Sequence, residues 1–128
     1  MEKINETEYL HVVWHAQRGQ PPLTAEREIA LAQSLEKEAA QWGVRVLALG
    51  CAADHLHLAL LVPAGGFPHR LLAQLKTVSA SHVPWQRREG VWRLSRNQLP
   101  YAVSYILCQK EHHARGDLWP FWELTRGK

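Results

Sequence analysis

The chain has 128 residues, of which 46% are hydrophobic and 21% are charged. A chain of this size can bury roughly two thirds of the surface that it exposes when unfolded, so we expect one domain over residues 1–128. It has no run of about 18 apolar residues, and its first six residues lack the order of a signal peptide, so we expect no membrane span and a cytoplasmic protein. In that setting we expect Cys51 and Cys108 to stay reduced.

The net charge of +3 is unevenly distributed along the chain. Residues 1–64 carry 5 Lys and Arg against 8 Asp and Glu, a balance of −3, whereas residues 65–128 carry 10 against 4, a balance of +6. A basic half is typical of a protein that binds a polyanion, although surface charge can also drift along a chain without a function. We expect the second half to supply most of a polyanion-binding surface.

The first half of the chain predicts one helix and three strands. Residues 9–15 are rich in aromatic and β-branched side chains and alternate between two faces, which predicts a strand. Thr24 is a suitable N-cap for a helix that ends at Gly43. Two short apolar runs, residues 44–49 and 55–62, then predict an antiparallel pair of strands. The expected apolar stripe of the helix consists of Ile29, Ala32, Leu35, Ala39 and Trp42.

The second half predicts two more helices and one strand. After a break rich in Pro and Gly at residues 63–68, a second helix is expected to end before Pro84. Residues 91–95 predict a fourth strand, and a third helix is expected from Pro100 to about His113. The expected inward residues are Leu71, Leu72, Leu75 and Val78 in the second helix, and Val103, Ile106 and Leu107 in the third.

The predicted order of elements is strand, helix, strand, strand, helix, strand, helix. This order is typical of an α+β fold with a ferredoxin-like, split βαβ antiparallel sheet whose helices cover one face, followed here by an extra C-terminal helix. Because such a sheet leaves its other face open, the extra helix can lie across that face and complete a site. The fold by itself predicts no chemistry.

The most informative motif is Asp54-His55-Leu56-His57. On a strand, His55 and His57 project from the same face, so their imidazoles form a natural pair of metal ligands. Taken alone, two histidines at this spacing are a weak signal in a chain that contains eight. We expect Asp54 to face away from His55 and to act as a turn residue or as a hydrogen-bonding partner of a ligand.

A second motif lies on the predicted third helix, where Tyr105 and Gln109 are one helical turn apart. If this helix lies across the free face of the sheet, His55, His57 and Gln109 offer two nitrogens and one oxygen to a divalent cation. Tyr105 then stands beside the cation as a nucleophile. Tyr101, one turn earlier, is the alternative nucleophile.

Other histidines lie near these motifs. His11 and His15 share one face of the first strand about 13 Å apart, which is too far for them to share an ion, although one of them can line the site. His112 and His113 can approach a phosphate group or can act as favourable cations near a helix C-terminus. None of these four is expected to be a ligand.

Two further motifs accompany the histidine strand and the helix with Tyr105 and Gln109. They are the opening His11-Val12-Val13-Trp14 and the pair Trp85-Gln86 before a glycine-containing strand. In this respect the chain resembles the single-tyrosine transposases of the HUH endonuclease superfamily, including insertion-sequence and REP-associated tyrosine transposases. The resemblance implies a metal-dependent nickase and strand transferase that acts on single-stranded DNA with hairpins. It also implies that Tyr105 becomes linked to a 5′ phosphate, and that His55, His57 and Gln109 bind Mg²⁺ or Mn²⁺.

Basic and aromatic side chains are interleaved in the predicted DNA-binding surface, where they would contact phosphates and stack on unpaired bases. The basic residues expected to bind DNA are Arg18, Lys76, Arg87, Arg88, Arg93 and Arg96. Trp85 and Trp92 lie among them and can stack on bases, although for each tryptophan a place in the core is the favoured alternative. Trp14 and Trp42 are assigned to the core. The run of residues 88–92 is less aromatic than the resemblance leads us to expect, and only one basic residue follows the first strand.

Two further expectations concern cofactors and partners. We expect no nucleotide cofactor, because a phosphotyrosine conserves the energy of the broken bond and the chain has no glycine-rich phosphate-binding loop. We expect a homodimer, since many members of the family pair, although others act as monomers. The alternative function is a domesticated protein that binds DNA hairpins without cleaving them; a replication or mobilisation nickase is disfavoured because such proteins usually carry further domains.

Overall fold

The computed structural model describes residues 7–63 and 68–108, which form a four-stranded antiparallel sheet and three helices. In chain order, the elements are β1 (Thr7–Ala16), α1 (Ala25–Gln41), β2 (Arg45–Cys51), β3 (His55–Pro63), α2 (Pro68–Ser79), β4 (Trp85–Leu94) and α3 (Leu99–Leu107). The strands are arranged in the order β2-β3-β1-β4, and every neighbouring pair is antiparallel. This arrangement confirms the predicted α+β fold with a split βαβ sheet.

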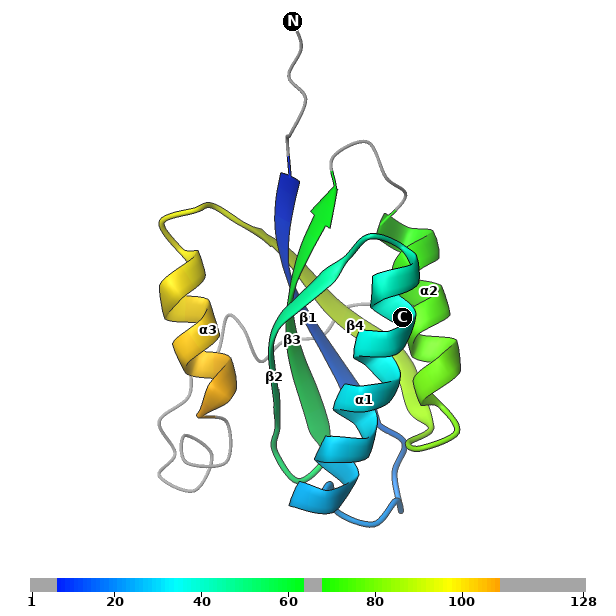
Figure 1. Ribbon diagram of the computed structural model, residues 1–128. Helices are drawn as coiled ribbons and strands as arrows, with labels where there is room; N and C mark the ends of the chain where they lie inside the picture. Colours follow the sequence, from blue (N-terminus) through cyan, green and yellow to red (C-terminus); the bar gives the residue numbers. More distant parts are fainter. Residues whose placement is uncertain (1–6, 64–67, 109–128) are drawn as a thin grey trace, which may run out of the picture.

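The sheet separates two layers of helix. Of the described helices, Figure 1 shows α1 and α2 on one side of the sheet and α3 on the other. The side under α1 and α2 holds the main core, in which Trp14, Leu56 and Leu58 are fully buried. The side under α3 has smaller apolar clusters and carries the histidines of β1 and β3. The extra helix therefore covers the predicted open face.

The register between β1 and β3 aligns the chemically interesting residues of both strands. His15 is paired with His55, and Val13 is paired with His57. On the other side of β1, His11 is paired with Trp92 of β4. Because paired residues in an antiparallel sheet point to the same face, all four histidines of β1 and β3 lie on the α3 side.

Local hydrogen bonds fix the ends of the helices. The Thr24 side chain accepts a hydrogen bond from the Arg27 backbone N–H (3.3 Å), as expected for an N-cap. Gly43, which follows α1, has a φ of +72°, a backbone conformation that favours glycine. Before α3, the Ser95 and Gln98 side chains each accept a hydrogen bond from the other residue's backbone N–H, which fixes the turn from β4 into this helix.

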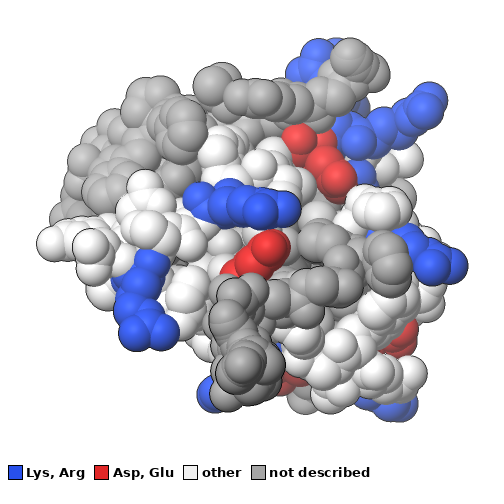
Figure 2. Space-filling view, turned by 90° about the horizontal axis from the view of Figure 1, so that it is seen from above, with Lys and Arg blue, Asp and Glu red and all other residues white. Residues whose placement is uncertain are grey.

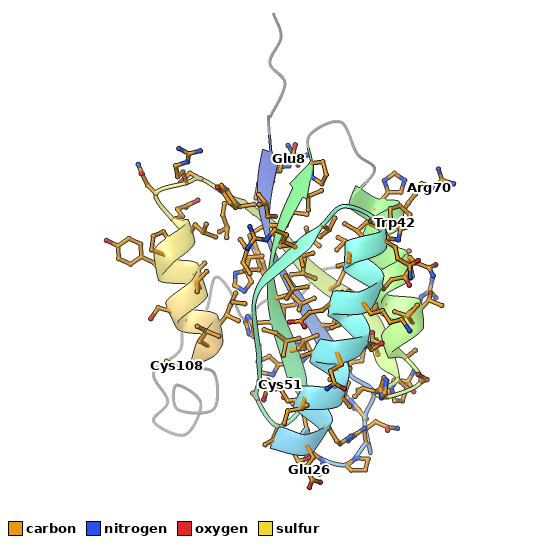
Figure 3. The ribbon with its side chains drawn as sticks, in the orientation of Figure 1. Glu8, Glu26, Trp42, Cys51, Arg70 and Cys108 are labelled. Carbon is orange, nitrogen blue, oxygen red and sulfur yellow. The ribbon has the colours of Figure 1, made fainter. Side chains whose placement is uncertain are left out.

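Several predicted side-chain placements were wrong. The buried stripe of α1 consists of Leu31, Leu35 and Ala39, while Ile29 and Trp42 are exposed. The Trp42 indole donates to Glu38 on the helix surface, and Figure 3 shows Trp42 at the end of α1, away from the sheet. Leu35 and Ala39 of the predicted stripe are thus buried, and Leu31 joins them in place of Ile29 and Trp42.

The fourth strand begins six residues earlier than predicted, at Trp85. Trp85 is buried against Trp14, and its indole N–H donates to the Ser79 hydroxyl (2.9 Å). It is therefore a core residue, which is the alternative favoured from the sequence, and it does not serve as a stacking residue. Ser79 takes the buried position at the end of α2 that was expected for Val78, because its hydroxyl satisfies the buried indole.

The last helix differs from the prediction at its inward face. Ala102, Tyr105 and Ile106 are buried, whereas Leu107 is 61% exposed. The predicted continuation of the helix to His113 lies outside the described residues. None of the helices in the described part of the chain has the length and apolarity needed to span a bilayer.

The contrast between two leucines gives a test of this fold. Leu58 is fully buried in β3, and Leu107 is exposed on α3. We expect Leu58→Ala to lower the free energy of unfolding by about 2–5 kcal/mol because it leaves a cavity. Leu107→Ala, the matched control, should change it by less than about 0.5 kcal/mol. Urea denaturation measures both values, and equal losses would contradict the assigned core.

Candidate active site

Four histidines form a continuous row on the face of the sheet beneath α3. The ring centroids are 5.0 Å apart for His11 and His57, 5.1 Å for His57 and His55, and 4.8 Å for His55 and His15. His11 and His57 are fully buried, and His55 is nearly so. We call His11, His57, His55 and His15 the histidine row. The sequence predicted the central pair, and the strand register adds a histidine of β1 at each end.

Each central histidine is held through its Nδ1 atom. His57 Nδ1 lies 2.8 Å from Nε2 of His11, and His55 Nδ1 lies 2.8 Å from Oδ1 of Asp54. A ring held in this way can coordinate a cation only through Nε2. Metal-binding histidines commonly have their other ring nitrogen fixed by a carboxylate or another polar group. The chemistry of the donors therefore fits a divalent cation at His55 and His57.

Asp54 does not face away from His55 as predicted. It precedes the first residue of β3, so strict strand alternation does not apply, and its side chain turns back to the neighbouring ring. The hydrogen bond from His55, together with the positive charge that His55 and His15 can carry, holds the pKa of Asp54 below its usual value despite partial burial. Asp54 is therefore an ionised partner of His55 at neutral pH.

A second set of donors overlaps the first. Within the described residues, one donor atom each from His15, Asp54 and His55 lie within 4.8 Å of one another. His15 was not predicted as a ligand, because along its own strand it lies too far from His11 for the two to share an ion. The pairing of His15 with His55 across the strands could have identified it. His55 is common to both sets.

The tyrosine that the structure brings to this row is Tyr105. It is only 2% exposed, packs with Leu94 and Ala102, and meets the ring of His57 edge-on at a centroid distance of 5.7 Å. Tyr101, the alternative nucleophile, is 67% exposed. The two tyrosines therefore differ sharply in their surroundings, although they are one helical turn apart.

The predicted third ligand, Gln109, lies outside the described residues, as do His112 and His113.

Figure 3 shows Cys108, at the end of the described helix, toward the same end of the molecule as Cys51 of β2. Both cysteines are free thiols, as expected. The β2–β3 hairpin that follows Cys51 leads directly into Asp54 and His55.

The predicted DNA-binding residues are dispersed. Lys76 of α2 lies 3.4 Å from Glu89, and Arg93 of β4 lies 3.5 Å from Glu8. Arg18 is exposed in the turn after β1, three residues from His15. The other basic residues of this set, also exposed, are Arg87, Arg88 and Arg96. Figure 2 shows basic side chains spread around one end of the molecule with acidic ones between them, and not as a single block.

Trp92 contacts the histidine row and does not stand free for base stacking. Its ring centroid is 5.3 Å from that of His11, and it is half-buried beside the α3 cluster. Trp92 therefore supports the buried end of the row. Of the two tryptophans predicted to stack on bases, one belongs to the main core and the other packs beneath α3.

Comparisons with known proteins agree with this architecture. A family profile described as "Transposase IS200 like" matches residues 5–115. A putative transposase from Deinococcus radiodurans R1 has a similar fold, with a TM-score of 0.66, 21% identity, and coverage of 86% of this chain and 98% of that chain. A REP-associated tyrosine transposase bound to a REP hairpin gives a TM-score of 0.65 and 17% identity, covering 94% of this chain and 78% of that one. No curated protein sequence matches the chain.

Proposed function

Since the chain belongs to the IS200-like transposase family, we propose that it cuts and rejoins single-stranded DNA beside hairpins through a 5′-phosphotyrosine formed at Tyr105. The observation that carries this proposal is the edge-on contact between Tyr105 and His57. This contact joins a tyrosine of α3 to one of the two histidines on β3. The family match supports a DNA-processing enzyme, and this contact supports the identity of its nucleophile.

The proposed reaction is a transesterification at phosphorus. The Tyr105 oxygen loses its proton and attacks the scissile phosphate, forming a bond from phosphorus to tyrosine as the bond to the 3′ oxygen breaks. The departing strand takes a proton and ends in a 3′ hydroxyl. In the second step, the 3′ hydroxyl of another strand attacks the phosphotyrosine, and the tyrosine oxygen leaves and is reprotonated. Bond energy is conserved, so no nucleotide is consumed.

The chain's own residues would prepare this reaction. His55 and His57 would hold a divalent cation through Nε2, and the proposed third ligand is Gln109. When bound, Mg²⁺ or Mn²⁺ supplies positive charge that stabilises the charge developing on the phosphate. Asp54 would orient His55. Because Tyr105 is buried, the side chains packed around it must give way before a phosphodiester can reach its oxygen.

Hairpin DNA is the partner that we propose, by analogy with the structurally similar transposase that is bound to a REP hairpin. Arg18 is the basic residue best placed for it, because it is exposed and follows β1, the strand that carries His11 and His15. Lys76 is less suited than the sequence suggested, because α2 lies on the opposite face from α3 and its ammonium group contacts Glu89. We also propose that the protein forms a homodimer.

The first prediction concerns the nucleophile. With Mg²⁺ or Mn²⁺, the protein should nick single-stranded DNA that carries the hairpins flanking its own gene and become covalently attached to the 5′ phosphate at the nick, and EDTA should stop the reaction. Tyr105→Phe should bind this DNA without cleaving it, because only the phenolic oxygen is removed. Denaturing gels with 5′- and 3′-labelled strands distinguish adduct from free product.

Tyr101→Phe is the matched control, since it makes the same change one helical turn away at an exposed position. It should cleave at the wild-type rate. Loss of cleavage in this variant alone would transfer the nucleophile to Tyr101. Binding without cleavage by the wild-type protein, with either metal, would favour the non-cleaving hairpin-binding protein.

The second prediction separates the two overlapping donor sets. His57→Gln should weaken Mn²⁺ binding by at least about 10-fold, because it removes a proposed ligand. His15→Gln should weaken it much less, because His15 belongs only to the outer set. Calorimetric titration with Mn²⁺ measures both affinities. A larger loss for His15→Gln would place the cation among His15, Asp54 and His55 instead.

The third prediction concerns the DNA-binding surface. Arg18→Gln should weaken hairpin binding and reduce the slope of log affinity against log salt by about 1, because one phosphate contact is lost. Lys76→Gln removes the same charge on the opposite face and should leave that slope unchanged. Fluorescence anisotropy across a salt series provides the measurement. A loss confined to Lys76→Gln would place the DNA over α2.

A further inference from the structure

His11 is a histidine of the site to which the proposed reaction gives no role. It lies on β1, is fully buried, and has its Nε2 atom 2.8 Å from Nδ1 of His57. A hydrogen bond between two imidazoles needs one ring to donate and the other to accept, so the contact constrains where both rings carry their protons. In a buried setting such a bond is strong, and leaving either ring without it is costly.

We propose that His11 is a positioning residue that fixes the ring orientation and the tautomer of His57 for cation binding. This inference rests on the proposed cation site at His57. A neutral His57 that coordinates through Nε2 must carry its proton on Nδ1, so it donates to His11. His11 then accepts through Nε2 and carries its own proton on Nδ1. The opposite arrangement would put a proton on the His57 nitrogen that binds the cation.

The packing around His11 holds it in place for this role. Its ring lies between His57, at a centroid distance of 5.0 Å, and Trp92, at 5.3 Å. The backbone is equally constrained, because β1 is paired with β3 on one side and with β4 on the other. His11 therefore has little freedom to turn away, and His57 meets its acceptor in one orientation.

The two central histidines are consequently supported in different ways. His55 is held by Asp54, its immediate neighbour in the sequence, whose side chain is 77% exposed. His57 is held by a fully buried ring from another strand. Replacing His11 should therefore affect cation binding through His57 and leave the Asp54–His55 pair in place.

The test compares two substitutions at position 11 by their Mn²⁺ affinity, measured calorimetrically. His11→Phe keeps a ring but removes the acceptor, and it should weaken Mn²⁺ binding by about 10- to 100-fold. His11→Gln restores an acceptor, because its amide oxygen can reach the position of the imidazole Nε2, and most of the affinity should return. Trp92→Phe is the packing control, since it alters the other side of His11 without removing the hydrogen bond.

A spectroscopic readout separates positioning from general support of the fold. Ring ¹⁵N NMR of the metal-free protein should show the His57 proton on Nδ1 in the wild type and in His11→Gln. In His11→Phe this preference for Nδ1 should be lost. Thermal unfolding without metal checks that each variant is folded.

Three results would overturn the inference. A folded His11→Phe protein with wild-type Mn²⁺ affinity would show that His57 needs no positioning by His11. Equal weakening in His11→Gln and His11→Phe, with unchanged thermal stability, would exclude the acceptor as the cause. A wild-type protein that does not bind Mn²⁺ would remove the proposed cation site itself, and the positioning role would fall with it.

Discussion

The antiparallel pairing of β1 with β3 is the constraint on which the candidate site depends. It sets His15 directly opposite His55 and brings His11 diagonally against His57. A shift of one residue would turn one strand's histidines toward the opposite face, because side chains alternate along a strand. The leucines of β3 resist such a shift, since they would leave the main core. The apolar pattern on one face thus secures the polar arrangement on the other.

Burial of the histidine row has an energetic consequence. A polar ring that is removed from water must be hydrogen-bonded, or it destabilises the fold. The two central rings meet this requirement through His11 and Asp54. Beneath α3, small side chains let the helix approach the sheet closely: Ala48 and Ala59 pack against Ile106, and Ala102 packs beside Tyr105. Close packing of the helix is what brings the tyrosine to the histidines.

The charge asymmetry between the two halves of the sequence has a limited meaning in the folded protein. The positive half contributes α2, β4 and α3, and in the part of it that the structure describes the basic side chains in view are spread out with acidic ones between them. Lys76 and Arg93 also have acidic neighbours from other elements, Glu89 and Glu8. A net charge counted along the chain cannot show this, because the distance between charges is set by folding.

Local sequence patterns determined much of this protein. Alternating and helical periodicities, with capping and turn residues such as Thr24 and Gly43, predicted the number and order of the elements, because these signals act over a few residues. Strand alternation also predicted that His55 and His57 share a face. The tertiary structure alone decided which residues from other elements meet them. The ring that His57 contacts through Nδ1, His11, is 46 residues away in the sequence, and the core position of Trp85 depends on Trp14 and Ser79. Such contacts follow from strand register and helix rotation, which are set by the packing of the whole core rather than by any local pattern.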